Sequence, residues 1–314
     1  MQRIASFFLL IAVLLFSGKR SSADDFFMET FHKGFGYVYN FEFRKADSLV
    51  SILEKKYPQE YRSYILGANY YWWKIRSGDT TPVCRRNYSV SLDKLQELLD
   101  KKKEVKKIGQ DEIFYYINLY SYRSRIELLD NNYIKALSYM TKCNAFITLS
   151  ANAEDSYEPF NLTSGLYNCF MAMAKKNNPL LAPYFLFAPS CDKEKGLKQL
   201  GKCTVNSDFL LSTEANYFLM IFYGEGDIDY SLSASYAEKL SLQYPNNLLY
   251  QYYLFKVKLL SGNLEQAMKN LILLFQKSRS MAGLNEVQRK YFTDMAGKDM
   301  MEYCKKHPTE KPEN

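Results

Sequence analysis

Apolar and polar positions recur with helical spacing along most of the chain, in blocks separated by short polar turns. We predict about a dozen helices arranged in hairpins, near residues 26–39, 41–56, 59–76, 88–104, 111–129, 132–149, 160–176, 192–203, 207–223, 230–243, 247–261, 264–279 and 285–304. The polar stretch 77–87 is predicted to be a loop. Prolines break the apolar run 180–188 too often for a helix, so we expect it to pack over the middle of the helical array or to touch a membrane.

Short sequence patterns repeat along the chain. The Leu-x-x-x-Tyr-Pro segment at 53–58 recurs at 240–245, and in both places a small residue, Ala46 or Ser233, lies 12 positions before the proline. Ala267 follows Ser233 after a further 34 positions. Small residues let paired helices approach closely, and the proline ends the second helix of each pair.

The turn before each small residue also repeats. It reads Asn-Phe-Glu-Phe at 40–43, Asn-Asn-Tyr at 131–133 and Gly-Asn-Leu at 262–264. These units resemble the tetratricopeptide repeat, a helix–turn–helix unit of 34 residues. The matching small, aromatic and proline positions are Gly34, Tyr37, Ala46 and Pro58; Tyr64, Ala68 and Tyr71; Tyr120, Ser124 and Ala136; Tyr217, Ser233 and Pro245; and Gly262 and Ala267.

Residues 150–206 do not match the repeat, and Phe255, Lys33 and Lys258 depart from its pattern. The arrangement as a whole is similar to exported bacterial proteins with divergent repeats, related to the group that includes tetratricopeptide repeat protein 39. A segment like 160–168 also occurs in those proteins. The resemblance implies an all-α fold: an α-solenoid of antiparallel helix hairpins, forming a TPR-like right-handed superhelix in one domain over residues 24–304.

The amino terminus has the pattern of a secretory signal peptide over residues 1–23. Arg3 is followed by an apolar run at 4–16, and small residues precede a cleavage point after Ala23. An uncleaved membrane anchor is the alternative, but this run is shorter than the roughly 20 residues that span a bilayer. We therefore expect a periplasmic or outer-membrane-associated chain with no transmembrane span after cleavage, ending in a flexible tail at 305–314.

Composition bears on chemistry. The formal charge of +7 falls to +4 when the three basic residues of the signal are removed, which is too weak to indicate nucleic-acid binding. Only two histidines occur and no catalytic motif accompanies them, so we predict a non-enzymatic protein without metal or cofactor. Six cysteines permit disulfides in an oxidising compartment, and a Cys191–Cys203 bridge would close a short loop. Burial of most of them as small hydrophobic residues is the alternative.

In the repeat that this sequence resembles, first-helix residues one turn apart line a concave groove. In that register the groove presents a mixed set of aromatic, amide and basic side chains, namely Arg62, Asn69, Trp72, Trp73, Asn118, Arg125, Tyr252 and Lys256. Such a set suits an extended peptide or an acidic tail, and equally suits stacking on a sugar. The tryptophans could also simply pack between hairpins. We predict a scaffold that binds another protein or peptide in the bacterial cell envelope, with glycan or small-ligand binding as the alternative.

Overall fold

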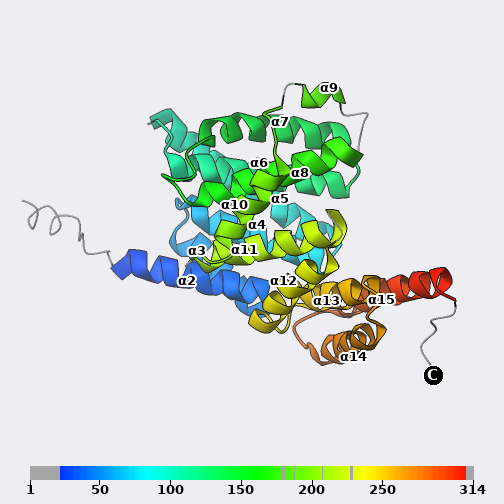
Figure 1. The fold of residues 1–314 in the computed structure, drawn as a ribbon. Coiled ribbons are helices and arrows are strands. Elements are labelled where there is room, and N and C mark those ends of the chain that lie inside the picture. The colour runs from blue at the N-terminus through cyan, green and yellow to red at the C-terminus, as the bar shows by residue number, and fades with distance from the viewer. Residues whose placement is uncertain are drawn as a thin grey trace, which may run out of the picture.

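A computed structural model describes residues 22–105, 107–177, 182–186, 188–206, 208–226 and 229–308. All regular structure in these ranges is helical (Figure 1). The helices are α2 (Ser22–Tyr39), α3 (Phe43–Lys56), α4 (Tyr61–Arg76), α5 (Pro82–Val105), α6 (Gln110–Leu129), α7 (Tyr133–Ser150), α8 (Pro159–Asn177), α9 (Ala182–Phe185), α10 (Lys193–Cys203), α11 (Phe209–Ile221), the π-helical turn η2 (Phe222–Gly226), α12 (Tyr230–Gln243), α13 (Leu248–Leu260), α14 (Leu264–Ser280) and α15 (Glu286–Lys306). Residues 1–21 of the expected signal peptide at 1–23 lie outside the described residues, as does the end of the tail at 309–314, and the last two residues of that peptide begin α2.

Consecutive helices pack against one another as hairpins, which confirms the predicted all-α solenoid. The repeated small residues lie where those helices meet. Ala46, Ser233 and Ala267 are fully buried, and Ala136 is almost so. A larger side chain at any of these positions would hold the two helices of a hairpin apart.

The recurring turns share one backbone conformation. Phe41, Asn131 and Gly262 all have positive φ, at 56°, 57° and 75°. In each turn the N–H of the next residue donates to the carbonyl five residues earlier, at 2.9, 2.8 and 3.0 Å. These bonds satisfy carbonyls at the end of the preceding helix. The turns that repeat in sequence therefore repeat in structure.

The two Tyr-Pro segments also match in structure. Tyr57 and Tyr244 end their helices with the same φ of −127°. The backbone N–H of each donates to the leucine carbonyl four residues earlier at 2.8 Å. The proline that follows lacks an N–H and cannot continue the helix, so the chain turns into the next hairpin.

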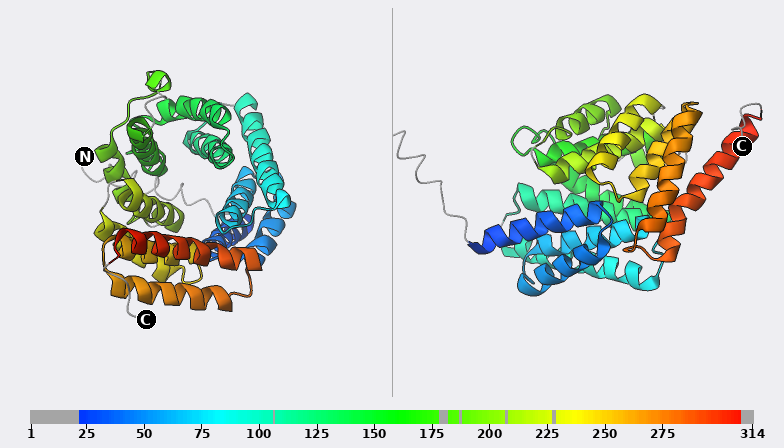
Figure 2. Two further views of the ribbon diagram at one scale, coloured as in Figure 1. Left: turned by 90° about the vertical axis from the view of Figure 1, so that its right-hand side faces the viewer. Right: turned by 90° about the horizontal axis from the view of Figure 1, so that it is seen from below.

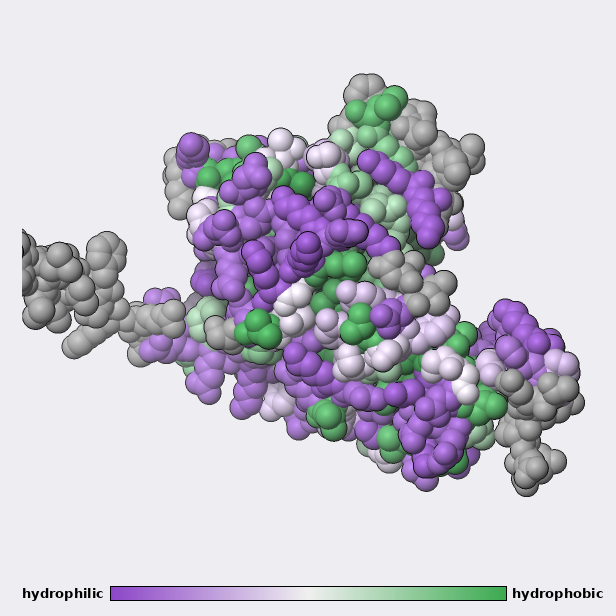
Figure 3. Space-filling view, viewed as in Figure 1, coloured by the Kyte–Doolittle hydropathy of each residue, from purple (hydrophilic) through white to green (hydrophobic). Residues whose placement is uncertain are grey.

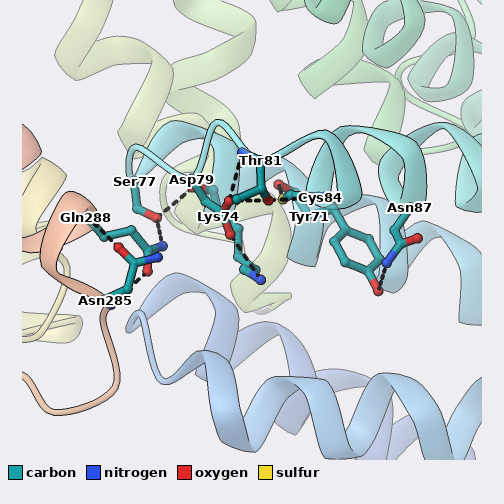
Figure 4. Close-up of polar contacts among 9 residues, drawn as sticks. All are labelled: Tyr71, Lys74, Ser77, Asp79, Thr81, Cys84, Asn87, Asn285 and Gln288. Atoms are coloured by element: carbon teal, nitrogen blue, oxygen red, sulfur yellow. Dashed lines mark hydrogen bonds and ion pairs between the residues drawn. The ribbon is translucent and has the colours of Figure 1, made fainter.

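The prediction of a loop over 77–87 is wrong in its second half, because α5 begins at Pro82. Asp79 accepts hydrogen bonds from the Thr81 backbone N–H at 3.1 Å and from the Thr81 hydroxyl at 2.6 Å (Figure 4). The Thr81 hydroxyl in turn accepts from the N–H of Cys84 at 3.3 Å. Threonine before proline is a good helix start, since proline lacks only an N–H that the first turn leaves unpaired.

The proline-rich run differs from its prediction over a short stretch, because Ala182–Phe185 forms the single turn α9. Residues 178–181 and 187 lie outside the described part of the chain. All six cysteines are described and have free thiols, so the candidate Cys191–Cys203 bridge is not formed. Four of the six are buried, which agrees with the alternative of small hydrophobic side chains: Cys84, Cys143, Cys169 and Cys203.

The solenoid closes into a ring, with the first hairpin beside the last helices (Figure 2, left). The Tyr39 hydroxyl donates to the Glu214 carboxyl at 2.7 Å, joining α2 to α11. The Asn247 side-chain amide donates to the Tyr39 carbonyl at 2.7 Å. The Gln288 amide of α15 donates to the Ser77 hydroxyl after α4 at 2.6 Å (Figure 4). These contacts join segments about 170 to 210 residues apart in sequence, so the ring is closed by hydrogen bonds between early and late helices of the chain.

Among the described residues, no helix is long and apolar enough to cross a membrane. The face of the molecule in Figure 3 is mostly hydrophilic, with hydrophobic side chains in separate small groups.

Candidate binding surface on the inner side of the ring

One face of α4 carries Asn69, Trp72 and Arg76, spaced three and four residues apart so that they lie in one row. Asn69 is buried, and its amide nitrogen donates to the hydroxyl of Tyr122 on α6 at 2.9 Å and to the carbonyl of Ile65 at 3.1 Å. Trp72 is buried with its ring tilted against Tyr88 of α5 at 6.1 Å. Asn69 and Trp72 are thus held in place by contacts to α6 and α5.

Arg125 of α6 lies among aromatic rings from three helices. Its guanidinium carbon lies 5.9 Å from the ring centre of Trp72 (α4), 4.9 Å from that of Tyr122 (α6) and 5.2 Å from that of Phe218 (α11). Because α4 and α11 belong to opposite halves of the chain, Arg125 lies between those two halves. Its guanidinium is half-buried and forms no ion pair or hydrogen bond with any described residue, although its charge acts on the Glu214 carboxyl.

Arg76 is the last residue of α4 and lies half-buried beside Tyr217 of α11. Its Nε is buried without a hydrogen-bond partner in the described structure, and no described acid pairs with it. Tyr217, and more weakly Tyr253 and Tyr291, raise the pKa of the Arg76 guanidinium, while its burial acts in the opposite direction. The side chain therefore remains charged, surrounded by phenol groups rather than carboxylates.

Glu214 supplies an acid on this side of the ring. It lies on α11 one turn before Tyr217 and Phe218. Burial raises the pKa of the Glu214 carboxyl, and the hydrogen bond from Tyr39 and the charge of Arg125 oppose that rise. Ionisation of a carboxyl in these surroundings is unfavourable, so Glu214 offsets the positive charge of the two arginines only in part.

Lys256 of α13 forms an ion pair with Glu225, with Nζ and Oε1 3.1 Å apart. The hydroxyl of Tyr253 donates to the same oxygen at 2.9 Å. Tyr253 also lies near enough to Arg76 and Tyr217 to interact with both electrostatically. The Lys256 pair therefore lies near Arg76 of α4. We call Asn69, Trp72, Arg76, Tyr122, Arg125, Glu214, Tyr217 and Phe218 together the inner surface.

Of the residues predicted to line a groove, the structure brings Asn69, Trp72 and Arg125 together. Lys256 forms an ion pair with Glu225, and Tyr253 links that pair to Arg76. Trp73 lies deeper, with its ring against four others in the contact that closes the ring: Tyr39, Phe41, Tyr217 and Tyr250.

The remaining three residues predicted to line the groove do not belong to the inner surface. Arg62 forms a two-point pair with Glu60, through Nε and one terminal nitrogen each at 2.9 Å, beneath α2. Asn118 donates to the Phe114 carbonyl of its own helix at 2.8 Å. Tyr252 donates to Asp299 of α15 at 2.6 Å.

Arg76 and Glu214 belong to the inner surface and were not predicted. Arg76 could have been found from the helical period, because it follows Arg62, Asn69 and Trp72 by 14, seven and four positions. Glu214 meets Tyr39 across 175 positions, and no local pattern indicates such a contact.

Chemically the inner surface offers cations, phenols and an amide. Among the described residues, no three His, Cys, Asp or Glu side chains lie together as a metal site would require. Unpaired guanidinium groups between aromatic rings bind anionic and planar groups well. Searches of family models, of curated proteins and of solved structures gave no match to this chain.

Proposed function

We propose that this chain is an exported, non-enzymatic scaffold of the bacterial cell envelope that binds a segment of another protein on its inner surface. The observation that carries the proposal is Arg125. It is a half-buried guanidinium in contact with rings of Trp72, Tyr122 and Phe218, and no described residue forms an ion pair with it. Arginine and aromatic side chains in such settings dominate the binding energy of protein interfaces.

The same contacts favour a protein over a sugar as the partner. Stacking on a sugar needs the open face of an aromatic ring. Trp72 and Trp73 are 9% and 2% exposed, and Arg125 and Tyr88 cover the former. Phe170 of α8 is 39% exposed and lies edge-on to Phe218 at 5.6 Å, so it is an exposed side chain in direct contact with the inner surface.

Site-specific photo-crosslinking in cells tests this proposal. A benzophenone amino acid at Phe170 is expected to capture a discrete protein partner. The matched control is the same group at Tyr133, which is 59% exposed at the turn between α6 and α7. Adducts from Tyr133 alone, or equal adducts from both positions, would contradict binding on the inner surface.

A further inference from the structure

The inner surface holds two half-buried arginines that form no ion pair with any described residue. Three others lie within ion-pair distance of a carboxylate: Arg62 with Glu60, Arg85 with Asp130, and Arg123 with Asp93. Arg76 and Arg125 have no such partner among the described residues, although both are half-buried. Partial burial removes water from a guanidinium and is unfavourable unless an anion or other acceptors replace that water. Tyr217 replaces it only in part for Arg76, because the Arg76 Nε has no hydrogen-bond partner in the described structure.

The two arginines are also close to one another. Arg125 covers the ring of Trp72, and Arg76 lies one helical turn further along the same face of α4, about 6 Å away along the axis. Tyr217 interacts electrostatically with both guanidinium groups. One bound segment can therefore reach both charges at once.

We propose that Arg76 and Arg125 together bind the side-chain carboxylates of an acidic segment of the partner protein. This inference rests on the proposed function and names the chemistry that the inner surface recognises. Each guanidinium can form two parallel hydrogen bonds to a carboxylate, and the aromatic rings around Arg125 exclude water from them.

The surroundings favour a carboxylate over a phosphate. α4 ends at Arg76 and α6 ends four residues after Arg125, so the carbonyl ends of both helices lie near the site. Those ends carry partial negative charge, and Glu214 adds more when it ionises. Singly charged groups are repelled less by these charges than a phosphate dianion would be.

Fluorescence anisotropy with a labelled peptide of alternating Glu and Ser tests the inference on the full-length protein after export. The peptide in which Gln replaces Glu is the matched probe. We expect the Glu peptide to bind at least tenfold more tightly than the Gln peptide. Arg76→Gln and Arg125→Gln should each weaken binding of the Glu peptide about tenfold. Binding should also weaken with added salt. Arg62→Gln is the control variant, because Arg62 pairs with Glu60 away from the inner surface.

Equal binding of the two peptides, or unchanged binding in both arginine variants, would overturn the inference. Displacement of the peptide by inorganic phosphate at a lower concentration than by acetate would also overturn it, in favour of a phosphate ligand. Arg125→Lys keeps the charge without the two-point geometry, and is expected to fold normally and bind with intermediate affinity.

The outcome can be separated from that of the proposed function. If Phe170 still captures a protein while the Glu and Gln peptides bind equally, the carboxylate inference fails and the scaffold proposal stands. If Phe170 captures no protein, the scaffold proposal itself fails.

Discussion

Replacing Tyr39 by Phe removes one hydroxyl from the contact that closes the ring and leaves the packing of the aromatic side chain intact. That hydroxyl donates to the Glu214 carboxyl at 2.7 Å, and the Tyr39 side chain is 1% exposed. A hydrogen bond to an ionised group contributes about 1.5–3 kcal/mol, and one to a neutral group about 0.5–1.5 kcal/mol. We therefore expect Tyr39→Phe to cost about 2 kcal/mol when Glu214 is charged and about 1 kcal/mol when it is neutral.

The pH dependence follows from the raised pKa of Glu214. Between the unfolded and folded pKa values of this group, the folded protein binds more protons, so its stability falls as the pH rises. Tyr39 favours the ionised carboxylate, and its loss raises that pKa further. The penalty of Tyr39→Phe is therefore expected to be larger at pH 8 than at pH 5.

Urea unfolding followed by circular dichroism at both pH values measures these penalties. Tyr133→Phe is the matched control, since its hydroxyl bonds only to the exposed Asn131 side chain, and it should change stability by less than about 0.5 kcal/mol. In a Glu214→Gln background the extra penalty at pH 8 should disappear. A penalty that does not differ from that of the control, or that is larger at pH 5, would refute the role assigned to this hydrogen bond.

Three further predictions concern packing, turns and thiols. Ala136→Leu should lower the unfolding free energy by about 1–3 kcal/mol, because Ala136 is buried. Ala145→Leu, on the exposed face of the same helix, should leave it unchanged. Equal urea midpoints for the two variants would argue against close packing of α7 at Ala136. Gly78→Ala should lower the melting temperature, because Gly78 has a φ of +97° and an added Cβ would lie 2.8 Å from the Tyr291 side chain of α15. Gly297→Ala is the control and should raise the melting temperature slightly, because no atom lies near the added Cβ. In a thiol-labelling time course, Cys191 should react quickly and the four buried thiols should react only on unfolding. Burial raises the pKa of the Cys84 and Cys143 thiols to about 11 and that of the Cys169 and Cys203 thiols to about 12. A Cys191 signal that is missing until a reductant is added would contradict the free thiols.

The helices and their order could be predicted from the sequence, because each depends on local periodicity and on nearby turn residues. The repeated turns before Ala46 and Ala267 are examples, since their left-handed residues and backbone bonds involve only neighbouring positions. The start of α5 could also have been predicted from neighbouring residues, because Thr81 followed by Pro82 is a common start of a helix.

The closure of the ring could not be predicted in this way. Trp72 and Trp73 are adjacent in sequence, but neighbours on a helix point about 100° apart. Trp72 therefore meets Arg125 on the inner surface, whereas Trp73 packs in the contact between the two ends of the chain. Only the position of α11 and α13, far along the sequence, decides which neighbours each tryptophan has.

The most direct test of the account is crosslinking from Phe170 in wild-type cells and in cells that carry both Arg76→Gln and Arg125→Gln. We predict a discrete protein adduct in the wild type and a loss of at least tenfold in the double variant, with the folded content unchanged by circular dichroism. An adduct equally abundant in both backgrounds would show that the two arginines do not hold the partner. The absence of any adduct in the wild type would contradict the binding of a protein on the inner surface.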